Sequence, residues 1–250
     1  MSGDIGKIFM ERTKYEHIGI PDQARGLPPP PVELPYEQSA ALVELPDPRT
    51  VKVRDVGLRQ AIEARRSVRK YSRQPLKPAE LSFLLWCTQG IREVIQKHTT
   101  LRTVPSAGAR HALETFLVVN NVESIDPGLY RFLPVEHKLL SLPSPEDLPE
   151  KFVSACLGQT FVRQSAATFI WAAAAYRMTW RYGQRGYRYL HLDAGHACQN
   201  LYLSAEAVGC GVCAVAAFSD DQVNEILGLD GNDLFAIYLA AVGKAGEGRG

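Results

Sequence analysis

The sequence predicts an α+β fold in which helices pack around a central sheet. Of its 250 residues, 46% are hydrophobic, which is enough to bury a sizeable core. Short apolar runs rich in strand formers recur along the chain, and segments with helical spacing lie between them. These patterns follow one another in mixed order rather than in strict alternation, which favours α+β over a parallel α/β fold.

The first part of the chain, residues 1–50, differs in composition from the rest. It contains four consecutive prolines at 28–31, further prolines at 35, 46 and 48, and little periodicity. This composition predicts an extended, polyproline-like arm that wraps on the surface or on a partner subunit. A disordered tail is the alternative that the composition leaves open. The predicted division is therefore an arm at 1–50 and one domain at 51–250.

Two helices are predicted next, and each has recognisable ends. The first opens at Gly57 and loses its apolar period at Ser67. The second opens at Pro78 and is stopped by Gly90. Their apolar faces consist of Leu58, Ala61 and Ile62 in the first helix and Leu81, Leu84 and Leu85 in the second.

The strands of the predicted sheet come from several apolar segments. Those at 128–132 and 137–142 flank a turn that contains a proline, which predicts a hairpin. The segment at 234–242 is apolar almost throughout, which is typical of a strand buried on both faces. The remaining strands are predicted at 116–119, 167–171 and 212–218.

Two more helices are predicted in the second half of the chain. The longer one spans about 189–207 and has many small residues between its leucines. The shorter one follows Ser219, which forms a capping-box pattern with Gln222, and it ends at Gly228.

Two groups of possible metal or redox residues are interpreted as structural. Of His191, Asp193 and His196, only the last two share a helix face, and two ligands are too few for a metal. Asp193 is instead interpreted as a residue near a helix start. Cys210 and Cys213 enter a strand rather than open a helix, so buried structural cysteines are favoured over a redox dithiol. No metal site is predicted.

The most informative motif is the run Arg65-Arg66-Ser67-Val68-Arg69 at the end of a helical pattern. Anions bind most readily at helix N-termini, so at a C-terminal end the side chains must supply the positive charge. Arginine is suited to binding phosphate oxygens through two hydrogen bonds. The cluster therefore suggests a phosphorylated cofactor or ligand. Solvated arginines that merely cap the helix are the alternative.

Two glycine-containing segments could approach a ligand closely. The tetrapeptide Pro105-Ser106-Ala107-Gly108 precedes a strand, where small residues let backbone amides reach a flat ligand. An ordinary turn is the alternative. Gly209-Cys210-Gly211 precedes another strand but does not continue into G-x-G-x-x-G at a helix start, so a Rossmann dinucleotide site is unsupported.

An aromatic and basic stretch lies between 180 and 189. It could line a pocket for an aromatic or anionic substrate, or it could form a subunit interface. The spacing leaves both open. Its members are Trp180, Arg181, Tyr182, Arg185, Tyr187, Arg188 and Tyr189.

Taken together in order, these motifs resemble the FMN-dependent nitroreductase superfamily. Within it, they are most similar to the thiazole/oxazole-forming, SagB-type dehydrogenase branch. The likeness runs from about residue 55 to Lys244. The segments that carry it are 61–71, 105–108, 188–189, 193–196 and 199–201.

The resemblance implies a nitroreductase-like fold, with a mostly antiparallel central sheet flanked by helices. It also implies an FMN site shared between two subunits of an intertwined homodimer. Arg65, Arg66, Ser67 and Arg69 would hold the phosphate and ribityl chain, and Lys244 is a further phosphate candidate. Pro105, Ser106, Ala107 and Gly108 of the partner subunit would lie against the isoalloxazine ring. Backbone N–H groups near flavin N5 and O4 would come from Ala216 and Ala217.

The implied activity is hydride transfer between NAD(P)H and an unsaturated, nitroaromatic or quinone-like acceptor through bound FMN. Azoline oxidation on a modified peptide is a second possibility, because the branch carries it out with a Lys-Tyr pair. Arg181-Tyr182 occupies the corresponding place, and an arginine with a pKa above about 12 is no base. Tyr182 is left as the candidate acid. A flavin-binding protein without turnover is a third possibility.

Charge and composition restrict the partners. Lys plus Arg number 28 against 27 for Asp plus Glu, so no overall field favours nucleic acid or an anionic membrane. We find no signal pattern and no apolar run of about 18 to 20 residues. Five cysteines without a secretory signal predict no disulfide framework. A cytoplasmic location is therefore expected.

Overall fold

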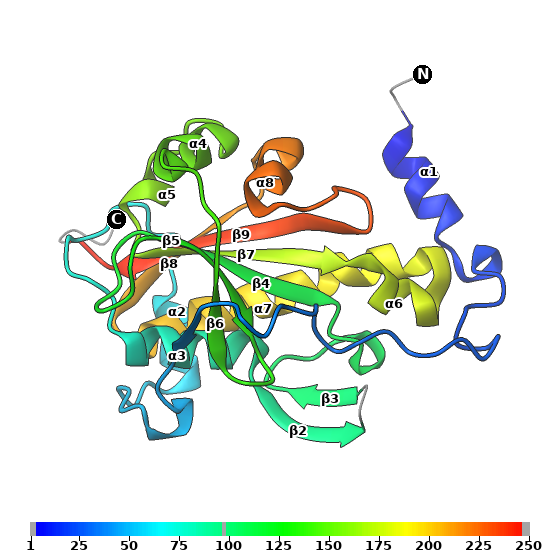
Figure 1. Ribbon diagram of the computed structural model, residues 1–250, viewed down its shortest axis with the longest axis horizontal. Helices are drawn as coiled ribbons and strands as arrows, with labels where there is room; N and C mark the ends of the chain where they lie inside the picture. Colours follow the sequence, from blue (N-terminus) through cyan, green and yellow to red (C-terminus); the bar gives the residue numbers. More distant parts are fainter. Residues whose placement is uncertain (1–3, 97–98, 247–250) are drawn as a thin grey trace.

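The computed structural model describes residues 4–96 and 99–246 and shows one large sheet between layers of helices (Figure 1). The sheet has seven strands in the order β1-β6-β5-β4-β7-β9-β8, and all neighbours are antiparallel. The predicted α+β fold with a mostly antiparallel sheet is confirmed. Residues 1–3 of the predicted arm, and 97–98 and 247–250 of the predicted domain, lie outside the described residues. The strands are β1 (Leu42–Glu44), β4 (Leu113–Val119), β5 (Gly128–Leu133), β6 (Lys138–Leu142), β7 (Ala167–Ala174), β8 (Cys210–Val215) and β9 (Leu234–Lys244).

Helices cover both faces of this sheet (Figure 1). The α-helices in the described residues are α1 (Ile5–Arg12), α2 (Leu58–Ala64), α3 (Pro78–Gln89), α4 (Leu148–Ala155), α5 (Phe161–Gln164), α6 (Ala175–Tyr182), α7 (Gly186–Ala207) and α8 (Asp220–Leu227). The helices α2, α3 and α7 lie on one face, and α4, α5 and α8 lie on the other. The predicted helices at 57–66, 78–89, 189–207 and 219–227 correspond to α2, α3, α7 and α8.

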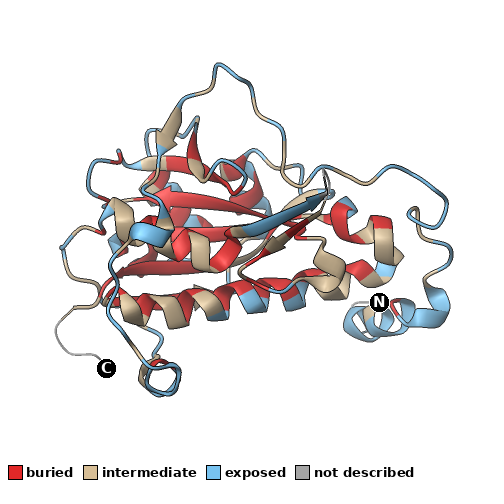
Figure 2. Cartoon of the chain, turned by 90° about the horizontal axis from the view of Figure 1, so that it is seen from below, coloured by how far each residue is buried: buried red, intermediate tan, exposed pale blue. Residues whose placement is uncertain are grey.

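The sheet separates two apolar cores. All residues of β4 are buried, and successive side chains of a strand point to opposite faces. Leu117 accordingly joins the core under α3 and α7, whereas Phe116 and Val118 join the core under α4 and α8. The central strands are red in Figure 2, which marks them as buried. The apolar run at the end of β4 is thus covered on both sides.

The two helices predicted after the arm differ in how far their apolar faces are covered. In α3, Leu81, Leu84 and Leu85 are fully buried, as their spacing predicted. In α2, Ala61 is buried, but Leu58 and Ile62 are 68% and 53% exposed. Part of the predicted apolar face of α2 therefore stays uncovered in a single chain.

The N-terminal segment is more structured than an extended arm. It contains α1 and a 3₁₀ turn, η1 (Tyr15–His17), which sequence analysis missed because no residue of α1 is buried. Figure 2 shows α1 mostly in the pale blue of exposed residues. Further along, β1 pairs with β6 and adds an edge strand to the sheet. The part between these elements is extended on the protein's own surface.

Buried arginines hold the extended part of this segment. Arg102 Nη2 donates to the carbonyl of Val32 at 3.1 Å, and Arg131 Nη2 donates to the carbonyl of Leu34 at 3.0 Å. The Leu34 N–H donates to Glu114 Oε1 at 2.9 Å. Three backbone groups of the segment thereby find partners inside the protein, which argues against the disordered alternative.

Three predictions about element ends were wrong. The helix α7 begins at Gly186, so Asp193 lies two turns inside it rather than at its start. Ser219 precedes α8 but its side chain makes no capping hydrogen bond, so the capping box is absent. The strand β8 ends at Val215 instead of 218, and this leaves Ala216 and Ala217 exposed in a loop.

Several elements had no clear sequence signal. The ribbon of β2 (Ile91–Gln96) and β3 (Thr99–Arg102) mixes charged and apolar residues without alternation. The helix α6 is rich in polar and aromatic side chains, and α4 and α5 are short. Within the described residues, no helix is both long enough and apolar enough to span a lipid bilayer.

Cys210 and Cys213 lie in a strand and are buried, as the sequence predicted. Both thiols are reduced and lie in β8 with exposures of 2% and 1%. Burial raises the pKa of Cys210 to about 12, so its thiolate is scarce at neutral pH.

Candidate functional site

The cation cluster, defined as Arg65, Arg66 and Arg69, lies on the segment that leaves α2 and runs beside β8. Ser67 pairs with Val212 of β8 in a parallel bridge, and the Val68 N–H donates to the Val212 carbonyl at 2.8 Å. The segment thus extends the sheet at the outer edge of β8.

Gly211 makes this close pairing possible. A Cβ atom at Gly211 would lie 2.5 Å from the Cβ of Val68, which is far inside van der Waals contact. The predicted close approach at the Gly209 to Gly211 turn is therefore present, and what approaches Gly211 is the side chain of Val68, in the segment that carries the cation cluster.

The cation cluster contacts aromatic rings and backbone carbonyls. Arg65 Cζ lies 5.3 Å from the centre of the Tyr202 ring, and Arg69 Cζ lies 5.9 Å from that of Phe161. Arg66 donates to the carbonyls of Glu63 and of Arg65 at 2.7 and 2.9 Å. Among the residues described, none of the three guanidinium groups pairs with a carboxylate, unlike Arg59, which bonds Glu63 at 2.9 Å. The cluster can therefore bind an anion without first breaking an ion pair.

Tyr202 of α7 orients the hydroxyl of Ser67. Its phenolic oxygen lies 3.1 Å from Ser67 Oγ and accepts a hydrogen bond from the Ala214 N–H at 2.8 Å. Because Ala214 occupies an acceptor lone pair of Tyr202, the phenol proton is available for Ser67 Oγ. Ser67 can then direct its own proton outward. Sequence analysis missed Tyr202 because 135 residues separate it from Ser67.

Lys244 is occupied by another partner. Its ammonium group bonds Glu80 Oε1 at 2.5 Å and the Val208 carbonyl at 2.8 Å, with only 11% of the side chain exposed. It lies opposite Cys210 in the β8–β9 ladder. The resemblance implied Lys244 as a further phosphate candidate, and in this structure its ammonium group forms an ion pair with Glu80.

The segment 105–108 is fixed by a buried carboxylate of α7. Ser106 Oγ donates to Asp193 Oδ2 at 2.6 Å, and the Ala107 N–H donates to Asp193 Oδ1 at 3.2 Å. Ser106 Oγ also accepts from the His111 N–H at 2.8 Å. Burial raises the pKa of Asp193, while the bonds from Ser106 and Ala107 oppose that rise.

Gly108 brings the segment 105–108 against α6. Its φ of 56° lies in the left-handed region, and a Cβ there would be 2.4 Å from Tyr182 Oη and 3.1 Å from Arg181 Nε. Both atoms therefore lie directly over Gly108. The structure brings Tyr182, the candidate acid, together with the segment predicted to face the flavin ring.

Ala216 and Ala217 present free backbone N–H groups. Both residues are exposed just after β8, and neither N–H has an acceptor within the described chain. The Ala217 carbonyl accepts from Gln159 Nε2 at 2.8 Å, which holds the loop in place. Both these donors and the cation cluster lie next to β8. Ser67, within the arginine run, pairs with Val212 of β8, and Ala216 directly follows the end of this strand.

The two parts of the predicted site lie on opposite sides of α7. Tyr202 contacts the cation cluster and Asp193 contacts the segment 105–108. The two residues are nine positions apart, which corresponds to about 14 Å and two and a half turns of helix. They therefore lie on opposite edges of α7.

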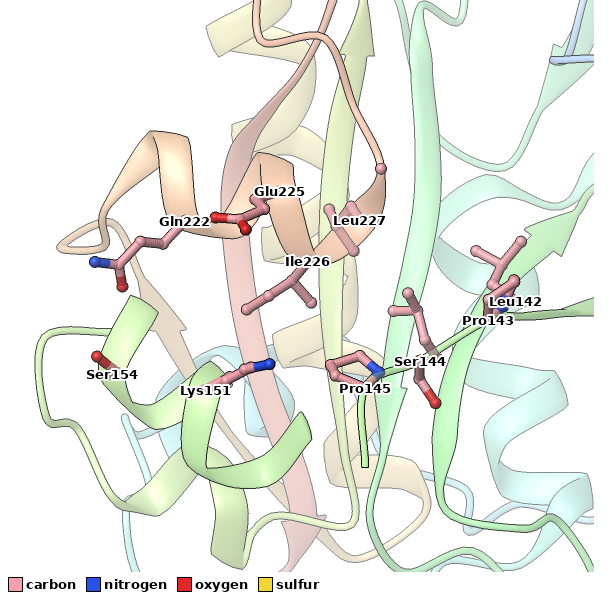
Figure 3. Close-up of a pocket in the computed structure, with 12 residues that line it drawn as sticks. Leu142, Pro143, Ser144, Pro145, Lys151, Ser154, Gln222, Glu225, Ile226 and Leu227 are labelled. Carbon is pink, nitrogen blue, oxygen red and sulfur yellow. The ribbon is translucent and has the colours of Figure 1, made fainter. Parts of the chain in front are cut away.

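A separate cavity of about 720 Å³ lies on the other face of the sheet (Figure 3). Leu142 and Pro145 line it on one side and Ile226 on the other, with Lys151 and Glu225 among its polar groups. None of the predicted site residues is among those that line it.

Comparison with known proteins identifies the family. The family model described as "Nitroreductase family" matches residues 62–244, which is most of the chain. The chain belongs to the nitroreductase family. A protein of Methanocaldococcus jannaschii named "putative nitroreductase" is 36% identical over 185 residues, which are 74% of this chain and 88% of that protein.

Solved structures agree with this membership. The crystal structure of a "putative nitroreductase" from Anabaena variabilis has a TM-score of 0.64 and 33% identity, and the match covers 76% of this chain and 38% of that one. This nitroreductase-family chain thus spans well under half of that structure's chain. A chain of the E. coli microcin synthetase complex has a TM-score of 0.63 and 17% identity. The match covers 97% of this chain and 92% of that one, which shows a common fold. The protein is thus a nitroreductase-family oxidoreductase.

Proposed function

We propose that this protein is an FMN-dependent oxidoreductase that passes hydride between NAD(P)H and an unsaturated, nitroaromatic or quinone-like acceptor. The observation that carries the proposal is the cation cluster beside β8, which has no carboxylate partner among the described residues. An oxidoreductase of this family needs a redox group, and exposed guanidinium groups next to a serine hydroxyl suit a group that ends in a phosphate.

The residues present fit FMN. Arg65, Arg66 and Arg69 would hold the phosphate oxygens, and Ser67 would donate the proton that Tyr202 leaves free. Lys244 would join them only by exchanging Glu80 for the phosphate. When bound, the flavin supplies the two-electron chemistry.

The opposite end of the flavin would meet polar groups that the chain leaves unpaired. The N–H groups of Ala216 and Ala217 can stabilise negative charge that develops on a reduced ring. Tyr182, whose hydroxyl lies over Gly108, would donate a proton to the acceptor. No residue besides these needs to take part in bond making.

We propose that two copies of the chain complete the site as a homodimer. The segment 105–108 and the cation cluster lie on opposite sides of α7, so a second copy would supply one of them. The uncovered faces of α2 and α7 carry Leu58, Ile62 and Leu192, which are 68%, 53% and 59% exposed. Burial of these side chains against a second copy would stabilise the pair.

A second candidate function is azoline-to-azole oxidation of a modified peptide. It is favoured by the fold shared with a chain of the microcin synthetase complex, whose structure contains a truncated pro-microcin. Arg181 weakens it, because a guanidinium group does not take up a proton at neutral pH. An azoline substrate should therefore remain unoxidised by this protein, whereas a nitroaromatic compound should be reduced.

The proposal is tested by the visible spectrum of the purified protein before and after addition of NADH or NADPH without oxygen. We expect flavin bands that bleach with one of the two donors and return when a nitroaromatic acceptor is added. A protein that stays colourless with added FMN would refute flavin dependence. Flavin that stays oxidised with both donors would instead indicate binding without turnover.

A further inference from the structure

Two arginine side chains, Arg110 and Arg181, lie at Gly108 of the segment 105–108. Two more, Arg185 and Arg188, follow Arg181 closely in the sequence. Arg110 and Arg181 are close enough that the charge of Arg181 helps burial to lower the pKa of Arg110. In the part of the chain that the structure describes, no carboxylate pairs with any of the four. By contrast, the buried Arg177 forms an ion pair with Glu114, with 2.5 Å between Nη2 and Oε1.

Two of the four are used to hold the N-terminal segment. Arg185 Nε donates to Tyr189 Oη at 2.7 Å, and its Nη1 donates to the Thr13 carbonyl at 3.0 Å. Arg188 donates to Thr13 Oγ1 and to the Met10 carbonyl. Their donors are thus directed at the chain itself.

The other two keep most of their donors free. Arg110 makes a single long bond, from Nε to the Gly108 carbonyl at 3.3 Å, and its Cζ lies 5.1 Å from the centre of the Trp180 ring. Arg181 stacks on Tyr182 with its Cζ 5.6 Å from the ring centre and donates no hydrogen bond to the described residues. Both are half-buried, so a ligand can reach them, while their mutual repulsion is only partly screened.

A series of aromatic contacts begins at Arg181, which lies over the ring of Tyr182. Tyr182 and Tyr189 meet edge to face with their centres 4.9 Å apart. The phenolic oxygen of Tyr15 lies 3.2 Å from that of Tyr189, and Arg185 Cζ lies 4.4 Å from the centre of the Tyr15 ring. The N-terminal segment therefore adds an aromatic side chain to the same cluster.

We propose that Arg110 and Arg181 bind the carboxylate of an aromatic acceptor, with the rings of Tyr182 and Tyr189 beside it and Tyr15 covering the outer side. A carboxylate would satisfy the free donors and offset the repulsion between the two guanidinium groups. The neighbouring rings favour an acceptor that is flat and apolar apart from that group. This inference rests on the proposed function, in which the segment 105–108 faces the flavin.

The first test is calorimetric titration of the purified protein with benzoate and with benzamide, which differ in charge but hardly in shape. We expect benzoate to bind at least about tenfold more tightly. Arg110→Gln and Arg181→Gln should each remove most of that preference, and Arg181→Lys should keep part of it. Arg49→Gln, an exposed arginine paired with Asp47, should leave the preference unchanged. Equal affinity for the two compounds would overturn the inference.

The second test compares kcat/KM for 4-nitrobenzoate and 4-nitrobenzamide with the same nicotinamide donor. The ratio cancels differences in flavin content between variants, and it should fall roughly tenfold in Arg181→Gln. An unchanged ratio with a raised KM for NADPH would show that the arginines bind the donor's phosphate and would overturn the inference. Absence of flavin from the wild-type protein would refute the proposed function instead, and the titration would still report on the anion site.

Discussion

Ser106 Oγ donates a hydrogen bond of 2.6 Å to Asp193 Oδ2, although 87 residues separate the two in the sequence. The carboxylate also accepts from the Ala107 N–H, so a buried side chain of α7 fixes the turn that carries Gly108. This pair connects the longest helix to the segment proposed to face the flavin. Loss of the hydrogen bond between Ser106 and Asp193 should therefore lower both stability and activity.

Ser106→Ala should destabilise the protein by about 1–3 kcal/mol, because a buried carboxylate loses its strongest donor. The measurement is urea unfolding at neutral pH, with Ser154→Ala on the exposed side of α4 as the control. Loss of the bond from Ser106 should also raise the pKa of Asp193 further. Equal stability of the two variants would show that the pair is dispensable.

Tyr202→Phe should weaken flavin binding and lower stability by about 1–2 kcal/mol, since the Ala214 N–H loses its acceptor and Ser67 loses its partner. Tyr187→Phe is a matched control, because the Tyr187 ring stacks on Phe235 and its hydroxyl makes no hydrogen bond within the described chain. Retention of flavin should be compared by gel filtration. If both variants retain flavin equally, Tyr202 has no part in orienting Ser67.

Gly211→Ala should displace the segment that carries the cation cluster, because the new Cβ would lie 2.5 Å from that of Val68. Overpacking of this kind costs about 1–3 kcal/mol, and here we also expect weaker FMN binding. Gly6→Ala, where nothing lies within 4 Å of the new atom, should leave both properties intact. A Gly211→Ala protein with wild-type FMN affinity would contradict the role assigned to this contact.

Stability should fall as pH rises from about 4.5 to about 7 because of Glu33. Burial, aided by the neighbouring Glu136, raises the pKa of Glu33 from 4.5 to about 7. The folded protein then holds a proton that the unfolded chain has released, so the free energy of unfolding decreases across that window. Glu33→Gln should flatten this part of the curve, measured by thermal unfolding at fixed ionic strength. A stability that rises with pH in the wild type but not in the variant would refute the assignment.

Local patterns in the sequence predicted most of the sheet and four helices, because their signals lie within a few residues. Leu81, Leu84 and Leu85 are an example, since their spacing alone defines the buried face of α3. The arginine run was recognised in the same way. The surroundings of the arginine run could not be predicted, because Tyr202 and Ser67 come together only through the tertiary fold.

The same reason explains other contacts that the sequence did not reveal. Asp193 was interpreted as a residue near a helix start, but its hydrogen-bond partners are in a distant turn. The bond between Lys244 and Glu80 could not be predicted, because it joins residues 164 positions apart. The helix α1 escaped notice because it buries none of its side chains.

The central claim, that Arg65, Arg66 and Arg69 bind the phosphate of FMN, is tested most directly by comparing affinities for FMN and riboflavin. The two flavins share the ring and the ribityl chain and differ in the phosphate. We predict that the wild type prefers FMN by roughly a hundredfold or more, and that Arg65→Gln and Arg69→Gln lose most of this preference while Arg59→Gln keeps it. Equal affinities of the wild-type protein for FMN and riboflavin would contradict the account.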